Sequence, residues 1–287
     1  MSGLPIVLFD GVVYGMLLFL MSVGLSVTLG LMGVVNLAHG SFAAMGGFAS
    51  VVLTSRFGVP FLLALPVAAA VTALAGAVLE RTLFRRLYRR SALDQVLFTV
   101  GMIYVWIALG TFVWGAGQQA VQLPVFLQGQ VELPGGYAVG RYRAFLLLVG
   151  AAVALAIFLG IERTRFGARV RAAQGDRDMA SGIGIRVDRL FAATFALGAA
   201  LAGLGGALSI PVLGLDPTFP LKYLVFFLIV VCVGGPGTVL GSLVAALAIG
   251  IIDVAGKYYA PEIGGFVIYA LVLLILFWRP NGIVARA

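Results

Sequence analysis

The polar side chains most able to do chemistry lie inside an apolar part of the chain, in the stretch Asn36–Ser41. Asn36, His39 and Ser41 can exchange hydrogen bonds with a solute, so they could form the polar lining of a pathway through a membrane. They could equally cap or kink a helix, and for His39 this structural role is the favoured interpretation. Because His39 is the only histidine and has no carboxylate near it, we expect no metal site and no other cofactor. No pairing of a nucleophile with a base predicts an intramembrane enzyme.

A second candidate is the glycine- and proline-rich break that begins at Gly234 and Gly235. It separates the apolar run 223–233, which is too short to span a membrane alone, from the run that resumes at Thr238. Such a break predicts a discontinuous transmembrane helix, and the glycines of the stretch 33–47 predict another. The N-terminus of a half-helix presents free N–H groups that suit a substrate carboxylate. We therefore predict a pathway between the two breaks, facing each other across the bundle and lined by Asn36, His39, Ser41, Gly234, Gly235 and Thr238.

The longest polar run, 162–189, contains seven arginines and four acidic residues between two apolar segments. Carboxylates at 176 and 178 mark the start of a short helix, where the dipole is positive. Apolar side chains at 179 and 183 then share one face, and two glycines end the helix. A short helix with an apolar face predicts a docking site for another protein. Its residues are Asp176, Arg177, Asp178, Met179, Gly182, Ile183 and Gly184.

Composition indicates a membrane protein, because 62% of the residues are hydrophobic, only 10% are charged and the mean hydropathy is +1.11. We predict a single all-α domain over residues 1–287, a polytopic transmembrane bundle of about eight or nine membrane segments with discontinuous helices. The paired breaks are equally consistent with an internal repeat and with packing glycines in two unrelated helices. We expect Ser209–Pro220 to form a bend, and Glu80 and Asp253 to lie at the membrane interface.

The basic residues predict the orientation of the chain in a lipid bilayer. The segments 81–90 and 163–189, together with Arg279 and Arg286, hold 14 of the 19 lysines and arginines. Cytoplasmic loops are enriched in these residues, so we predict an outside N-terminus and a cytoplasmic C-terminus. The same rule explains the pI of about 10.1, and no nucleic-acid partner is expected. The first apolar segment lacks the basic start of a signal peptide and is expected to be retained.

Three stretches, Gly30–Phe42, 164–189 and Gly234–Gly250, resemble the Liv-type permease subunits of branched-chain amino-acid ABC importers. The resemblance covers nearly the whole chain. It implies a bacterial inner-membrane importer with two related permease subunits, two cytoplasmic ATPases and a periplasmic or extracellular substrate-binding protein. It also implies that the short helix in the arginine-rich loop couples the permease to an ATPase. Substrates within the family are branched-chain or related amino acids, amides or urea.

Two alternative functions remain open on the residues alone. A secondary transporter would carry acidic residues or lysines inside its spans for ion coupling, and the span interiors contain almost none. A channel for a small polar solute has support only from Asn36-Leu37-Ala38, which resembles the re-entrant asparagine motif of water and glycerol channels but has no second copy. No GxxxxGK[ST] motif is present, so the chain itself has no P-loop and any ATP coupling must come from a partner.

Overall fold

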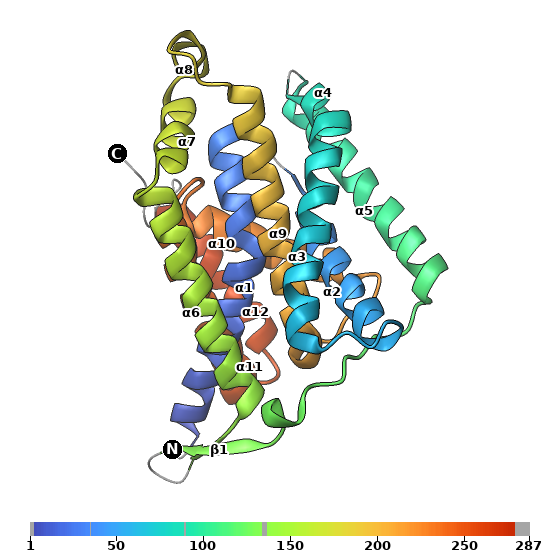
Figure 1. Cartoon of the computed structure of the whole chain (residues 1–287). Helices are drawn as coiled ribbons and strands as arrows, with labels where there is room; N and C mark the ends of the chain where they lie inside the picture. The colour runs from blue at the N-terminus through green and yellow to red at the C-terminus, as the bar shows by residue number, and fades with distance from the viewer. Residues whose placement is uncertain (1–2, 35, 89, 134–136, 279–287) are drawn as a thin grey trace.

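The computed structural model describes residues 3–34, 36–88, 90–133 and 137–278. Arg279 and Arg286, which contribute to the predicted orientation, lie outside these residues, as does the C-terminus. The fold is an all-α bundle, as predicted (Figure 1). Its helices are α1 (Leu4–Met32), α2 (His39–Ser55), α3 (Phe61–Leu79), α4 (Arg85–Leu87), α5 (Ala92–Trp114), α6 (Arg141–Glu162), α7 (Arg165–Gly175), α8 (Arg177–Gly182), α9 (Val187–Leu213), α10 (Phe219–Gly234), α11 (Val239–Tyr259) and α12 (Gly264–Trp278).

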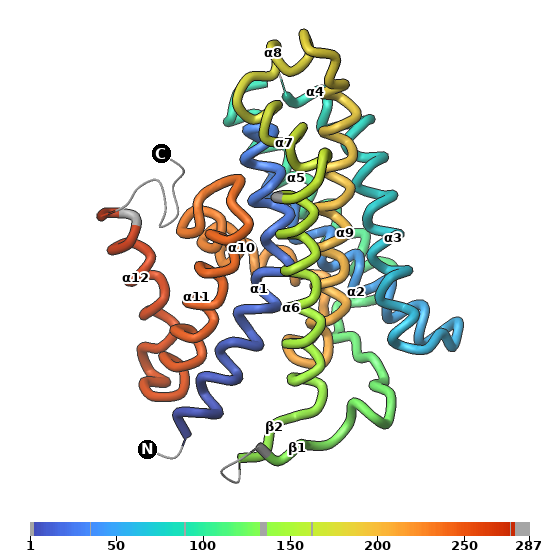
Figure 2. Tube along the Cα trace, turned by 60° about the vertical axis from the view of Figure 1, so that its left-hand side comes forward, coloured from blue at the N-terminus to red at the C-terminus, as the bar shows by residue number. Residues whose placement is uncertain are grey.

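A π-helical turn, a 3-10 turn and a short β-hairpin connect some of these helices. A π-helical turn, η1 (Glu80–Phe84), joins α3 to α4. The connection between α5 and α6 contains a 3-10 turn, η2 (Val125–Leu127), and an antiparallel hairpin of β1 (Gln130–Leu133) and β2 (Tyr137–Gly140). This hairpin lies at the end of the molecule opposite α8 (Figure 2).

Among the described residues, six helical segments are long and apolar enough to cross a membrane: α1, α3 with its extension to Leu87, α5, α6 as far as Ile161, α9 and α11. They account for six of the eight or nine membrane segments predicted from the sequence. Two shorter apolar helices, α10 and the first part of α12 (Gly264–Ile275), stand beside them. The 17-residue α2 follows the first break.

Small residues on α1 position it at the centre of the bundle. Side chains from Leu17 to Met21 are almost completely buried. A Cβ atom at Gly24 would lie 2.5 Å from the Cα of Gly198 on α9, and one at Gly15 would lie 2.7 Å from the Ala246 carbonyl oxygen on α11. Only glycine permits such close backbone approach, which is how helices pack tightly in lipid. In contrast, α5 lies at the edge of the bundle and is largely exposed (Figure 1).

The units α1–α2–α3 and α9–α10–α11 share one arrangement. In each, a long helix ends at a glycine with positive φ (65° at Gly33, 70° at Gly214), and a break and a short helix follow. The N–H of His39 donates to the Asn36 carbonyl, and that of Phe219 donates to the Asp216 carbonyl. Helix α1 packs on α9, α10 and α11, and helix α9 packs on α1, α2 and α3. The long helix of each unit therefore packs on all three helices of the other unit.

The structure corrects one expectation. Helix α9 continues through Pro211, so only residues 214–218 of the expected Ser209–Pro220 bend are non-helical. Glu80 and Asp253, which we expect at the membrane interface, are both buried within the protein. The Glu80 carboxylate accepts a hydrogen bond of 2.7 Å from the Tyr88 hydroxyl, and Asp253 lies more than one turn before the end of α11 at Tyr259.

Candidate functional site

The first break contains a cluster of buried polar atoms. Helix α1 ends at Met32 because Gly33 takes a left-handed conformation that other residues adopt at a cost. Asn36 is only 2% exposed, and neither atom of its side-chain amide has a hydrogen-bond partner in the described part of the chain. The same holds for His39 Nε2 and the Ser41 hydroxyl. Leaving such groups unpaired costs about 1–3 kcal/mol each, so this cluster is well suited to meet a polar solute or water.

The second break is firmly packed. Gly235 and Gly237 have positive φ values of 88° and 79°, and the Gly237 N–H donates to the Ser26 carbonyl of α1 at 2.9 Å. The Thr238 hydroxyl lies 2.8 Å from the carbonyl oxygens of Gly234 and Gly235, so it satisfies the exposed end of α10. Thr238 therefore has a clear structural role as well as its predicted place in the pathway.

The two breaks approach each other through α1 rather than directly across the bundle. A Cβ atom at Gly30 would lie 2.3 Å from the Cα of Gly237, which places the second break beside the last turn of α1. The stretch that contains Asn36 instead meets the start of α10, since a Cβ at Gly40 would lie 3.1 Å from Pro220. The sequence predicted both breaks, but their positions relative to α1 depend on how the helices pack in the tertiary structure.

The predicted docking helix is present as α8. The Asp176 carboxylate caps it, accepting hydrogen bonds of 2.9 Å from the N–H groups of Asp178 and Met179. Met179 and Ile183 are 67% and 70% exposed, so the apolar face points away from the bundle. Gly182 lies in open space, and Gly184 follows the helix with a φ of 87°. The sequence did not predict α7, which precedes α8 and connects it to α6.

Arg177 points toward the bundle instead of toward a partner. Its Nη2 atom donates to the Met32 carbonyl at 2.9 Å, and its guanidinium lies 4.4 Å from the centre of the Phe191 ring on α9. These contacts attach α8 to the last residue of α1, directly before the first break. Around them lies a cavity of about 760 Å³ lined by Arg85, Arg86, Tyr88, Arg177, Asp178, Ser181, Val187, Asp188 and Phe191. Burial and the hydrogen bond to Glu80 raise the pKa of Tyr88, so this hydroxyl keeps its proton as a donor.

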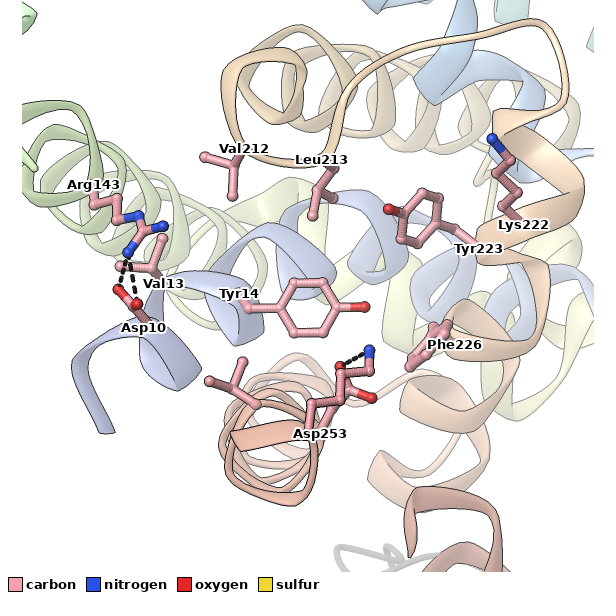
Figure 3. A pocket seen from close by; sticks show the side chains of 12 residues that line it. Asp10, Val13, Tyr14, Arg143, Val212, Leu213, Lys222, Tyr223, Phe226 and Asp253 are labelled. Carbon is pink, nitrogen blue, oxygen red and sulfur yellow. Dashed lines mark hydrogen bonds and ion pairs between the residues drawn. The ribbon is translucent and has the colours of Figure 1, made fainter. Parts of the chain in front are cut away.

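A second cavity, of about 430 Å³, lies in the other half of the bundle, and the sequence analysis missed it (Figure 3). Its lining is Asp10, Val13 and Tyr14 of α1, Arg143 of α6, Val212 and Leu213 of α9, Lys222, Tyr223 and Phe226 of α10, and Asp253, Val254 and Lys257 of α11. The charged residues come from four helices, of which only α10 and α11 are consecutive in the chain. Only the Asp253–Lys257 spacing of four residues could have indicated part of it.

Ion pairs organise this cavity. Arg143 Nη1 lies 2.5 Å and 2.6 Å from the two carboxylate oxygens of Asp10. Lys257 Nζ lies 2.6 Å from Asp253 Oδ2, and Lys222 donates to Asp216 in the break before α10. Burial alone would raise the pKa of Asp216, but its hydrogen bonds from Lys222 and Thr218 outweigh burial and lower the pKa. Asp216 is thus charged at neutral pH and holds Lys222 at the cavity.

Long apolar helices around a buried polar break define a polytopic helical membrane protein. The chain matches the family model described as "Branched-chain amino acid transport system / permease component" over residues 7–276. It therefore belongs to this family of transport permeases, as its sequence predicted. In the described part of the chain, no group of three or more histidines, cysteines or acidic residues is placed to hold a metal ion.

Individual relatives agree with this assignment. The high-affinity branched-chain amino acid transport system permease protein LivH of Escherichia coli K12 is 28% identical, over 97% of this chain and 94% of LivH. BraD of Pseudomonas aeruginosa, with the same description, is 26% identical over 97% of this chain and 95% of BraD. LivM of Escherichia coli K12 is 24% identical over 93% of this chain and 68% of LivM. No solved structure matches the chain.

Proposed function

We propose that the chain is the permease subunit of an ATP-driven importer and carries branched-chain or related amino acids across the bacterial inner membrane. The observation that carries this proposal is α8, a capped helix that exposes Met179 and Ile183 and is attached through Arg177 to the end of α1. An exposed apolar helical face suits a groove on a partner protein. Two cytoplasmic ATPases, a second related permease and a periplasmic or extracellular binding protein would complete the importer.

The orientation that fits this role has the arginine-rich end, with α7 and α8, in the cytoplasm. The N-terminus and the hairpin of β1 and β2 would then lie outside. Counting α2, α10 and α12 with the six long helical segments would give nine membrane segments, and an odd number would put the C-terminus in the cytoplasm when the N-terminus is outside. Support for an inverted repeat comes from α1 and α9, which run in opposite directions: Gly24 lies beside Gly198, and Met21 beside Gly205. Transporters built from inverted repeats bind substrate near the repeat interface.

The inner part of the pathway would run along the end of α1. The unpaired polar atoms of Asn36, His39 and Ser41 offer hydrogen bonds there, and the break at Gly234, Gly235 and Thr238 lies beside the last turn of α1. Because Arg177 contacts the Met32 carbonyl, a movement of α8 would reach Asn36 through only a few residues. ATP binding at the docked subunits could therefore open or close this part of the pathway.

The test is transport by the assembled importer in proteoliposomes. Wild-type complex should take up leucine only with ATP and the binding protein, and Met179→Asp with Ile183→Asp should lose both the ATPase and transport while the permease stays inserted. A matched control is Val125→Asp with Phe126→Asp, two exposed apolar residues in the connection between α5 and α6 and outside the spans, which should retain the ATPase. Uptake driven by an ion gradient without ATP would instead indicate a secondary transporter. Full coupling in the doubly substituted α8 variant would rule out α8 as the docking element.

A further inference from the structure

The cavity of Figure 3 combines charged groups of both signs with an apolar wall. Its charged lining residues are two acids, Asp10 and Asp253, and three bases, Arg143, Lys222 and Lys257. Ionisable residues within membrane segments are costly and as a rule functional. A volume of about 430 Å³ falls within the range of roughly 300–1,000 Å³ typical of small-molecule sites.

Asp253 is the residue that most needs a ligand. Its side chain is buried, with the whole residue only 2% exposed, and Lys257 pairs with Oδ2 alone. The other carboxylate oxygen, Oδ1, is buried and has no hydrogen-bond partner among the described residues. A buried carboxylate oxygen that lacks a donor is unfavourable, and a second ammonium group would satisfy it.

Lys222 and Lys257 supply positively charged hydrogen-bond donors that complement the Asp253 carboxylate. An ammonium group has three N–H donors, and the contacts of Lys222 with Asp216 and of Lys257 with Asp253 each use one. The remaining donors could bind a carboxylate. Figure 3 shows Tyr14 between Asp253 on one side and Tyr223 with Lys222 on the other, so the Asp253–Lys257 pair and Lys222 lie on opposite sides of the Tyr14 ring. Val13, Val212 and Phe226 provide apolar surface beside it.

We infer that this cavity is a binding site for a zwitterionic amino acid, with Asp253 receiving the α-ammonium group, Lys222 the α-carboxylate and the apolar wall the side chain. The inference rests on the transport function proposed above, and it adds the site at which the permease first binds that substrate. The residues that line the cavity include Asp10 near the start of α1, Arg143 near the start of α6 and Lys257 near the end of α11. These helix ends lie at the end of the molecule away from α8 (Figures 1 and 2). In the proposed orientation this is the outer half, into which a binding protein would deliver its substrate.

The experiment measures protection of a cysteine in the cavity wall. Val212→Cys in a Cys232→Ala background is labelled with a water-soluble thiol reagent in the assembled importer in nanodiscs, without binding protein. L-Leucine should slow the labelling, and it should do so at a concentration at least tenfold lower than isocaproate, which lacks the ammonium group, or isoamylamine, which lacks the carboxylate. Asp94→Asn, on exposed α5, is the control and should leave protection by leucine unchanged.

Matched variants separate recognition from a general loss of structure. Asp253→Asn should raise the leucine concentration needed for half-protection at least tenfold and remove the preference for leucine over isocaproate alone. Lys222→Gln should instead remove the preference over isoamylamine alone. A collapsed cavity would lose both preferences together, and that result, or unchanged protection in Asp253→Asn, would overturn the inference.

Uptake of leucine in proteoliposomes tests the proposed function separately from protection of the cysteine. If wild-type importer takes up leucine in proteoliposomes but leucine gives no protection at Val212→Cys, the cavity is not the binding site and the transport function stands. If the importer does not transport any amino acid with ATP and binding protein, the proposed function itself fails.

Discussion

Replacing Arg177 with methionine should separate docking of the ATPase from its coupling to transport. Arg177 does not belong to the apolar face formed by Met179 and Ile183, and its guanidinium contacts the Met32 carbonyl at 2.9 Å and the Phe191 ring at 4.4 Å. Methionine keeps the apolar stem and removes only the charged group. Met179 and Ile183 stay exposed, so the ATPase should still bind.

The size of the effect follows from the two lost contacts. A hydrogen bond from a charged group contributes about 1.5–3 kcal/mol, and a cation–π contact about 0.5–2 kcal/mol. A combined loss of about 2–5 kcal/mol would shift the balance between attached and detached α8 by roughly thirtyfold or more, at about 1.4 kcal/mol per factor of ten. We expect leucine uptake per ATP hydrolysed to fall at least tenfold.

The assay compares co-purification of the ATPase, ATP hydrolysis and uptake in proteoliposomes for wild type, Arg177→Met and the control Arg165→Met. Arg165 is an exposed arginine near the start of α7 and should tolerate the change in all three measurements. Two results would refute the reasoning. Uptake at the wild-type rate in Arg177→Met would show that its contacts with α1 and α9 do not transmit the movement, and loss of the ATPase would show that Arg177 is part of the docking surface.

Two further predictions concern topology and the pathway. Reporter fusions at Gln174 should read as cytoplasmic and those at Gln130 as periplasmic, and an external signal at Gln174 would invalidate the proposed orientation. In a Cys232→Ala background, Ser41→Cys and Thr238→Cys should react with a small water-soluble thiol reagent in one nucleotide state of the assembled importer and less in another. Labelling that is absent in every state would make these two stretches structural.

The helix caps, helix ends and apolar spans of this protein could be predicted from its sequence, because each depends on residues that are neighbours in the chain. Asp176 caps α8 through N–H groups two and three residues ahead, and Gly33 and Gly235 end helices through their own backbone conformation. The apolar runs identify the spans because lipid excludes unpaired backbone groups. Family-specific stretches carried the assignment to transport permeases for the same reason, since they are contiguous.

The cavity of Figure 3 and the attachment of α8 depend only on the tertiary structure. Asp10, Arg143, Lys222 and Asp253 lie on four helices and read in the sequence as isolated charges near span ends. They meet because glycines such as Gly15 let α1 approach α11 closely enough to bury Asp253. Arg177 resembles every other arginine of its loop until packing brings it to the Met32 carbonyl, 145 positions away. Contacts of this range depend on how helices pack against one another, and no pattern within one segment encodes them.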